Sequence, residues 1–574
     1  MMKKYLLFLV LCLCTGLLKA QLIKPQSGVT EKLERKQAEL DWFNCSFDRD
    51  SVYGCEVNKA YEFLKGRKLK KRPVVAIIGY GMDVEHEDLK GAIWRNRKEK
   101  SDGKDNDKNG LTDDLYGWNF LGGKDGRILE KISKEGVREF IRLWSKYKDF
   151  VMDPNQKKYI KLKEGRLEEI SAPADKEELD YLIYQVGPEA GDLLPHHNGN
   201  LWMFDRVAAV KRIDSLLKEK FENPDTIGVR SWLKIGREYY SQLLGVDVEK
   251  QAFEQVILGA CYSRKNNWGH IRELFFERER SDYRDDFSGL MRVRQDQRNE
   301  VIGDDPWNLE DKVYGNNVLL TTDAAIGTMQ AGIIGCQRDN GIGINGIMDK
   351  AEIMTLRVAG QEGEPYLKDI VLAMYYAIDH DADIIVLPQQ NTLYPLEQKE
   401  WMSQALRYAE QKGVLVIVPS WSLGQNLDVE TFYPNRWMDG GKELTNLMVV
   451  SVSDQKGNPQ KESNYGKKSV DLFAPGVGIY SAYSGDTYQY GSGNGMVGVM
   501  TAGVAALIKA YFPQLTGSQI RDILLKSVTS RNEVIVEKGI GQGESDVFYF
   551  GDLCLSGGIL NAYQAVVEAS KISK

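Results

Sequence analysis

A glycine-rich turn that runs directly into an apolar helix constrains this chain more than any other stretch. The segment Tyr490–Pro513 reads YGSGNGMVGVMTAGVAALIKAYFP. Small residues before Met496 let the backbone turn tightly, and Val504, Leu507 and Ile508 then recur at helical spacing until the proline ends the run. Such a helix belongs inside a protein. Alone, the turn would indicate only close packing between a strand and a helix.

The neighbouring residues make the turn specific. The segment Ser463–Gly476 reads SNYGKKSVDLFAPG. Together with the turn and helix, it resembles the nucleophile region of the subtilisin-like serine proteases, whose motif is G-T-S-M-A-x-P. At those seven positions this chain reads GNGMVGV, from Gly493 to Val499. The resemblance therefore places Gly495 where the family has its nucleophilic serine.

The other three catalytic positions also differ from the family pattern. Gly79 follows the strand-like run Val74–Ile78, where the family has an aspartate. The histidine of H-G-T-x-x-A-G is Ile326, and the oxyanion-hole asparagine after the run Val414–Val418 is Ser422. A hydroxyl nucleophile needs a base, the base needs an orienting carboxylate, and the oxyanion needs preorganised donors. The resemblance thus implies a catalytically degenerate member in which none of these roles is filled.

Displaced residues offer an alternative set of catalytic groups. Ser492 and Thr501 flank the turn, and Asp83 and Asp323 lie near the other two positions. A serine without a base is inert at neutral pH. Relatives also carry carboxylates beside their catalytic residues, so we interpret both aspartates as structural.

Size and charge limit the class of protein and the partners. The 574 residues suffice for one large domain or for two to three ordinary ones. A net charge of −7 offers no general attraction for nucleic acid or for an anionic membrane. We therefore expect no nucleic-acid partner.

The N-terminus carries the pattern of an export signal. Residues 1–20 read MMKKYLLFLVLCLCTGLLKA, which combines two lysines, an apolar run and a small residue before Gln21. The run is too short to span a bilayer comfortably, which argues against an uncleaved anchor. Leucine precedes both Cys12 and Cys14, which argues against a lipoprotein. We expect a mature chain without a transmembrane segment that is secreted, periplasmic or at the cell surface.

Five cysteines remain after the signal segment. Cys45 and Cys55 flank FDRDSVYG, and in an exported chain this spacing favours a local disulfide between them. Buried small apolar side chains are the alternative interpretation. We interpret Cys261, Cys336 and Cys554 as core residues.

The resemblance covers two separate parts of the chain. We predict an N-terminal helical segment at 21–72, a first core part at 73–121, a helical insertion at 122–303 and a second core part at 304–574. In the insertion, Glu135–Tyr147 and the stretch from Arg206 to Leu217 have helical periodicity. Its tryptophans, Trp144, Trp202, Trp232 and Trp268, indicate a small core of its own, or a binding surface if they are exposed.

The second core part alternates strand and helix patterns. The runs 353–357, 384–387 and 414–418 read as strands, and 368–379 and 398–411 read as helices. This alternation predicts an α/β fold with a parallel sheet and helices on both faces. The resemblance implies the same subtilisin-like fold, with a pocket at the carboxyl ends of the strands.

An acidic loop before the sequence Gly-Trp-Asn-Phe120 has an EF-hand-like pattern. Carboxylate and carbonyl oxygens at alternate positions are the ligands that calcium prefers. Tyr116 stands where the bidentate glutamate would be, and a solvated turn is the alternative. Relatives with the same loop favour a structural Ca²⁺ ion. The predicted ligands are Asp105, Asp107, Asn109, Asp113 and the carbonyl of Leu111.

Three functions are consistent with these patterns. We favour an exported, non-catalytic subtilisin-like protein that binds a peptide or protein partner, or serves as a scaffold for one, such as a related active protease. The alternative is a serine endopeptidase that uses displaced catalytic residues. A third hypothesis is an adhesion or surface-assembly protein whose core only holds the insertion, which an exposed tryptophan cluster would favour.

Overall fold

The computed structural model describes most of the core and parts of the insertion. The described residues are 37–147, 150–153, 158–163, 166–170, 205–241, 267–270, 272, 297–388, 393–430, 432–437, 441–541 and 543–572. The predicted signal peptide and Cys261 lie outside these ranges. Within them, no helix has both the length and the apolar character needed to cross a membrane.

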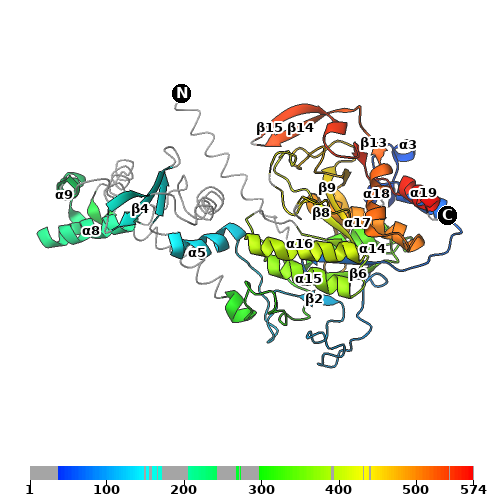
Figure 1. The fold of residues 1–574 in the computed structure, drawn as a ribbon, viewed down its shortest axis with the longest axis horizontal. Helices are drawn as coiled ribbons and strands as arrows, with labels where there is room; N and C mark the ends of the chain where they lie inside the picture. Colours follow the sequence, from blue (N-terminus) through cyan, green and yellow to red (C-terminus); the bar gives the residue numbers. More distant parts are fainter. Residues whose placement is uncertain are drawn as a thin grey trace, which may run out of the picture.

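A nine-stranded sheet organises the core (Figure 1), with the strand order β13-β16-β10-β9-β8-β7-β1-β6-β2. Neighbouring strands are parallel except at one edge, where β13 runs antiparallel to β16. The three strands predicted in the second core part are present, which confirms the parallel sheet. The strands are β1 (Val74–Gly79), β2 (Gly117–Asn119), β6 (Glu352–Arg357), β7 (Ile384–Val386), β8 (Leu415–Pro419), β9 (Leu447–Ser453), β10 (Leu472–Pro475), β13 (Thr529–Ser530) and β16 (Gly558–Ile559).

Alternate residues of the central strand β1 face two different hydrophobic cores. Val75 and Ile77 belong to one core, whereas Val74, Ala76 and Ile78 belong to the other. Successive strand side chains point to opposite faces, so both faces of the sheet must be covered. The predicted α/β fold with helices on both faces is therefore confirmed. One core contains α14 (Ala324–Gly335), α17 (Asn494–Tyr511), α18 (Gly517–Lys526) and α19 (Ala562–Ile572), and the other contains α15 (Leu367–Asp379) and α16 (Leu396–Gln411).

The helix α17 is the central buried element that its sequence predicts. Val504, Leu507 and Ile508 are fully buried. A Cβ atom at Gly503 would lie 2.9 Å from the Cβ atom of Ile347, so the glycine permits a close approach between the helix and that segment.

Two hairpins of the core lie outside the main sheet. One pairs β11 (Ile479–Tyr483) with β12 (Thr487–Gly491). The other pairs β14 (Ile535–Gly541) with β15 (Glu544–Tyr549) and is followed by the 3₁₀ helix η6 (Phe550–Asp552).

The N-terminal segment consists of short helices packed on the core. Trp42 and Phe43 are buried against the core that contains α17. The indole Nε1 of Trp42 also donates to the carbonyl of Gly478 at 3.1 Å. The elements are α2 (Gln37–Leu40), η1 (Trp42–Asn44), α3 (Phe47–Asp50) and α4 (Val57–Leu64).

The structure does not contain the predicted disulfide, since no bond joins the sulfur atoms of Cys45 and Cys55. Both side chains are buried. Burial raises the pKa of the Cys45 thiol to about 12, and it raises the pKa of Cys55 well above its usual value. The thiolate is the reactive form in disulfide chemistry, so burial disfavours the reaction. The alternative interpretation of both residues as buried small side chains fits the structure.

The insertion contains the predicted helices and a sheet that we did not predict. The helices α5 (Glu135–Tyr147) and α8 (Asp205–Lys220) match or extend the two predicted helical patterns, and α9 (Val229–Ser241) is a further helix. The strands β3 (Phe150–Asp153), β4 (Lys158–Lys163) and β5 (Arg166–Ile170) form an antiparallel sheet. The alternating sequence KYIKLK of β4 is the signal that could have revealed it. A 3₁₀ helix, η4 (Pro224–Thr226), separates α8 from α9.

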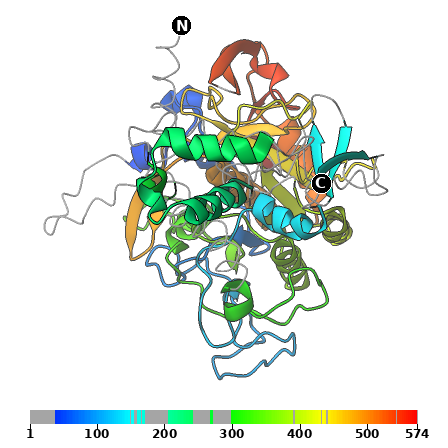
Figure 2. The same ribbon diagram turned by 90° about the vertical axis from the view of Figure 1, so that its left-hand side faces the viewer.

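Two tryptophans form a small core within the insertion. Trp232 and Trp268 are fully buried, and their ring centroids lie 5.4 Å apart. Nε1 of Trp268 donates to Oδ1 of Asp214 at 2.9 Å. Figures 1 and 2 place α8 and α9 at one end of the molecule, in front of the core in the second view. The core interpretation holds for these two tryptophans, and the side chains of Trp144 and Trp202 lie outside the described residues.

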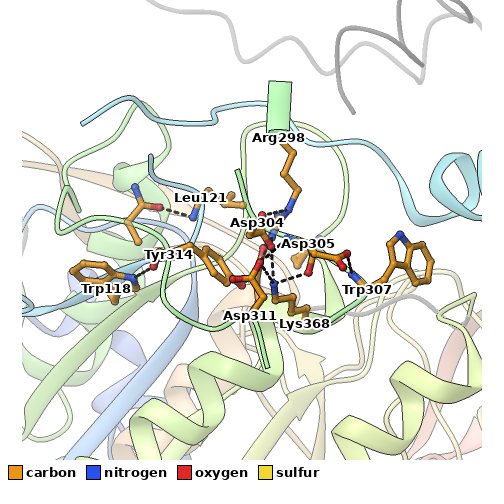
Figure 3. Close-up of polar contacts among 12 residues, drawn as sticks. Trp118, Leu121, Arg298, Asp304, Asp305, Trp307, Asp311, Tyr314 and Lys368 are labelled. Carbon is orange, nitrogen blue, oxygen red and sulfur yellow. Dashed lines mark hydrogen bonds and ion pairs between the residues drawn. The ribbon is translucent and has the colours of Figure 1, made fainter. Parts of the chain in front are cut away.

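A buried ionic network marks the point where the chain returns from the insertion to the core (Figure 3). Arg298 Nη2 lies 2.9 Å from Oδ2 of Asp304 and 2.7 Å from Oδ1 of Asp369. Nζ of Lys368 donates to Oδ2 of Asp304 at 2.8 Å. The hydroxyl of Tyr314 donates to Oδ1 of Asp369 at 2.6 Å. The network thereby joins the returning chain to α15.

A single aromatic ring connects both ends of the insertion. The guanidinium carbon of Arg138, in α5, lies 4.0 Å from the ring centroid of Tyr366, and that of Arg298 lies at the same distance. Nη1 of Arg138 also donates to the carbonyl of Glu364 at 2.9 Å. Both ends are therefore held at the residues that lead into α15.

Candidate functional site

Four positions of this chain correspond to the catalytic residues of the family. The segments that carry them meet beyond the carboxyl ends of the parallel strands. Gly79 is the last residue of β1, and Ser422 follows β8. Ile326 lies in the first turn of α14, and Gly495 lies in the first turn of α17. The sequence interpretation thus places its four site residues in elements that adjoin one another.

Direct contacts connect these segments. The turn after β1 touches α14, because a Cβ atom at Gly327 would lie 2.0 Å from the carbonyl oxygen of Gly81. Nε2 of Gln330, also in α14, donates to the carbonyl of Gly495 at 3.0 Å. Nδ2 of Asn494 donates to Oγ of Ser422 at 2.6 Å. The four positions therefore line one region of the protein.

The two triad-equivalent positions outside α17 have no polar side chain. A Cβ atom at Gly79 would meet no other atom within 4 Å, so there is open space beside this backbone. Ile326 is 40% exposed, and it presents an apolar surface where the family has its base.

A glutamine takes the space beside the nucleophile-equivalent position. A Cβ atom built on Gly495 would lie 3.2 Å from Nε2 of Gln330, which is tighter than ordinary van der Waals contact. The same nitrogen donates to the Gly495 carbonyl. We did not single out Gln330 from the sequence, although it belongs to the motif that contains Ile326. Its position beside Gly495 becomes visible only in the three-dimensional structure.

The loop after β8 has an unusual backbone at the residue before Ser422. Trp421 has φ +75°, a left-handed conformation that costs a bulky side chain of the order of 1–3 kcal/mol. Relatives have glycine here in the G-N-x-G motif that the resemblance supplies. The carbonyl of Trp421 accepts from the backbone N–H of Asn464 at 2.8 Å, which fixes the loop. This loop therefore keeps a glycine-type backbone although it carries a tryptophan.

Both aspartates near the site have partners other than a base. Oδ2 of Asp323 lies 2.9 Å from Nη2 of Arg357, and both side chains are buried. Arg357 pairs in register with Gly79 across β1 and β6. Asp83 accepts backbone N–H groups from Gly485 at 2.8 Å and from Glu85 at 3.2 Å. Their structural interpretation agrees with these contacts.

Both hydroxyls that flank the turn are also engaged with the backbone. Thr501 is fully buried and donates to the carbonyl of Val497 at 2.9 Å. Oγ of the exposed Ser492 accepts from the N–H of Gly478 at 2.8 Å. Within the described ranges, neither hydroxyl has a histidine as a hydrogen-bond partner.

The acidic loop gathers carboxylates, but not in the predicted set. Oxygens of Glu99, Asp105 and Asp107 lie within 4.8 Å of one another. Glu99 is 3% exposed, and its Oε2 has no hydrogen-bond partner among the described residues. The sequence analysis missed this residue because it precedes the EF-hand-like pattern. An orphaned buried carboxylate oxygen among other carboxylates is a set of donors that suits a hard cation.

Two of the other predicted ligands are used within the loop itself. Asp113 accepts from the backbone N–H groups of Asp102 and Gly103, both at 3.1 Å. Oδ1 of Asn109 accepts from the N–H of Leu111 at 2.7 Å, and its Nδ2 donates to Asp114 at 2.9 Å. Only Asp105 and Asp107 of the predicted set belong to the carboxylate group around Glu99.

Comparison with known proteins identifies the family. The profile described as the Subtilase family matches residues 70–543. The chain is 31% identical over 204 residues to Subtilisin BL from Lederbergia lenta, which is 36% of this chain and 70% of the relative. It is 33% identical over 182 residues to the Thermophilic serine proteinase of Bacillus sp. (strain AK1), which is 32% of this chain and 42% of the relative.

A solved structure is also similar, at a level that carries no argument by itself. The structure of the prenylagaramide maturation protease PagA aligns with 43% of this chain and 82% of its own, at 22% identity and a TM-score of 0.34. The profile match spans far more than half of the chain. The chain therefore belongs to the subtilase family, a family of serine peptidases.

Proposed function

We propose that this chain is a non-catalytic member of its family that binds a peptide or protein partner without cleaving it. The contact between Gln330 and Gly495 carries the proposal. A carboxamide is bound to the backbone of the nucleophile-equivalent residue and takes the space that a side chain there would need. Since Ile326 and Gly79 supply neither a base nor a carboxylate, the chemistry of an activated hydroxyl has no groups to support it.

The partners of the displaced residues support the same proposal over the endopeptidase alternative. Thr501 donates to a helix carbonyl in the interior, and Asp323 is paired with a buried arginine. Moving Asp323 into a catalytic arrangement would take a carboxylate away from the buried Arg357, and leaving a buried charge without its partner costs about 3–5 kcal/mol. The parallel sheet of a peptidase is kept, and binding does not need the missing catalytic groups.

Labelling with a fluorophosphonate probe tests the absence of catalysis. The purified protein is treated with the probe, and a broad peptide library is assayed for cleavage beside an active subtilisin. We expect no label and no cleavage. Labelling with turnover that is lost in Ser492→Ala or Thr501→Val would establish relocated catalysis and overturn the proposal. A capture experiment with the same library then tests binding.

We also propose that the chain is exported and that its acidic loop holds a structural Ca²⁺ ion. The signal-peptide pattern of residues 1–20 supports export, and N-terminal sequencing of the mature protein should begin at Gln21. The carboxylates of Glu99, Asp105 and Asp107 support the cation. Bound there, Ca²⁺ would neutralise carboxylates that the fold brings together.

A further inference from the structure

Two carboxamides on either side of Gly495 are incompletely hydrogen-bonded. Gln330 is 8% exposed and Asn494 is 9% exposed. Oε1 of Gln330 and Oδ1 of Asn494 are buried and have no hydrogen-bond partner among the described residues. A buried polar atom without a partner costs about 1–3 kcal/mol. Such a cost at two adjacent places needs an explanation.

The orientation of the Gln330 amide is fixed by its other end. Its nitrogen must face the carbonyl of Gly495, because a carbonyl oxygen only accepts. Its oxygen is therefore the unmatched group, and it requires a donor. For Asn494, the bond to Ser422 can form with either end of the amide, and in both orientations one polar atom stays unmatched.

The surroundings of these amides are neutral and partly apolar. Ile326 is 40% exposed, Leu423 is 52% exposed and Tyr490 is 50% exposed, and each belongs to a segment that borders the site. The nearest acidic side chain of α14's first turn, Asp323, is neutralised by Arg357. A ligand for this site therefore needs neutral hydrogen-bond donors next to apolar groups. A peptide main chain meets this requirement better than a free amine or an inorganic ion does.

The loop before Ser422 supplies a donor of the opposite kind. Nε1 of Trp421 is buried and has no acceptor within the described part of the chain. Trp421 also carries the strained backbone noted above. Trp421 directly precedes Ser422 in the chain, and an indole N–H together with unmatched acceptors suits a ligand that presents both N–H and C=O groups, as a peptide does.

We propose that Gln330 and Asn494 form a recognition site for the main chain of an uncleaved peptide, with Oε1 of Gln330 accepting a peptide N–H. The inference rests on the proposed binding function and deepens it, because it assigns residues that would contact the peptide main chain. The residues beside the lost nucleophile would thus provide the groups that hold the ligand.

The test uses hexapeptides with an acetylated N-terminus and an amidated C-terminus, so that binding cannot depend on a charged terminus. The library is panned against the mature protein, and the affinity of one selected peptide is measured for the wild type, Gln330→Leu and Asn494→Ala. Gln398→Leu is the matched control, because Gln398 is also nearly buried, at 6% exposed, but lies in α16. Thermal unfolding checks that each variant folds.

We expect Gln330→Leu and Asn494→Ala to weaken binding at least tenfold and Gln398→Leu to leave it unchanged. A scan with N-methylated peptides should find one position that weakens binding to the wild type and has no further effect on Gln330→Leu. This loss of additivity would identify the N–H that Gln330 accepts.

Two other outcomes would overturn the inference and differ in what they imply for the proposed function. Equal affinity in all variants would mean that the peptide binds elsewhere and that the amides are bridged by water alone, so the binding function would stand. No binding by any hexapeptide would contradict both the inference and the proposed peptide partner. If Gln330→Leu does not fold, the N-methyl scan on the wild type together with Asn494→Ala decides.

Discussion

The polar groups at the return of the insertion differ in charge from those of the candidate site beyond the carboxyl ends of the parallel strands, which we call the strand edge. The return is held by Arg298 and Lys368 against Asp304 and Asp369 (Figure 3), all within hydrogen-bond distance. The strand edge contains the neutral side chains of Gln330, Asn494 and Ser422, which are only partly matched.

This difference distinguishes buried polar groups that stabilise the fold from buried polar groups that are available to a ligand. A buried ion is tolerated only where a partner balances it, so a fully paired network indicates a role in holding the fold together. A neutral amide with an unmatched atom costs far less, so a protein can keep it ready for a ligand. In a peptidase the strand edge would carry a charged triad, whereas here the three equivalent positions, Gly79, Ile326 and Gly495, carry no charge.

Breaking the ionic network should have the largest effect. Arg298→Met leaves Asp304 and Asp369 buried without the arginine, so we expect a loss of about 3–5 kcal/mol in the free energy of unfolding. Urea denaturation measures it. Should the variant fail to fold, Tyr314→Phe removes only the hydroxyl bond to Asp369, at an expected cost of about 1–2 kcal/mol.

A surface ion pair provides the control for that prediction. Lys131 and Glu362 lie 2.9 Å apart, and both side chains are 52% exposed. Solvent screens such a pair, so Lys131→Met should change stability by no more than about 0.5 kcal/mol. Equal effects of Arg298→Met and Lys131→Met would show that the buried network does not hold the fold.

Calcium should provide the next largest effect, because the acidic loop brings the carboxylates of Glu99, Asp105 and Asp107 close together. An ion present at 100 times its dissociation constant stabilises the folded state by about 2.7 kcal/mol. We expect chelation with EGTA to lower the melting temperature, and Glu99→Gln to remove most of the calcium-dependent increment. Asp125→Asn is the control, since Asp125 is exposed and paired with Arg127. A full calcium response in Glu99→Gln would place the ion elsewhere.

The sequence predicted the parallel sheet, α17, α5 and α8, because each shows hydrophobic periodicity along the chain. The family's motif order also led us to expect that the segments carrying the four positions adjoin one another. It could not predict the contact between Gln330 and Gly495, which are 165 residues apart. Glu99 was missed for a related reason, because its carboxylate reaches the loop through folding and not through motif spacing. Side-chain partners of this kind depend on tertiary structure.

Placing a charge at the strand edge tests whether that edge depends on neutrality. Gln330→Glu puts a carboxylate beside the Gly495 carbonyl, at a position that is 8% exposed. The folded state should then favour the protonated acid, whereas the unfolded chain loses its proton near pH 4.3, about the reference value for glutamate. Above that pH the folded state binds more protons than the unfolded state, so stability falls as pH rises.

We expect the free energy of unfolding of Gln330→Glu to be close to that of the wild type at pH 4 and lower by about 2 kcal/mol at pH 7. Urea denaturation at pH 4, 5.5 and 7 measures it. Gln404→Glu is the control, because Gln404 is exposed on α16 and its charged form stays hydrated. A pH-independent difference between Gln330→Glu and the wild type would mean that water reaches the strand edge freely.

Restoring the serine should have the smallest effect on stability and none on activity. In Gly495→Ser the new Cβ lies 3.2 Å from Nε2 of Gln330, so one of the two must shift, at an expected cost of about 1 kcal/mol. The double variant Gly495→Ser with Gln330→Ala removes the crowding, so the two single effects should not add. Because Ile326 and Gly79 still supply no base and no carboxylate, neither variant should react with a fluorophosphonate. Labelling of the single variant would mean that the strand edge retains activating groups, and the contrast with the charged network would then lose its functional meaning.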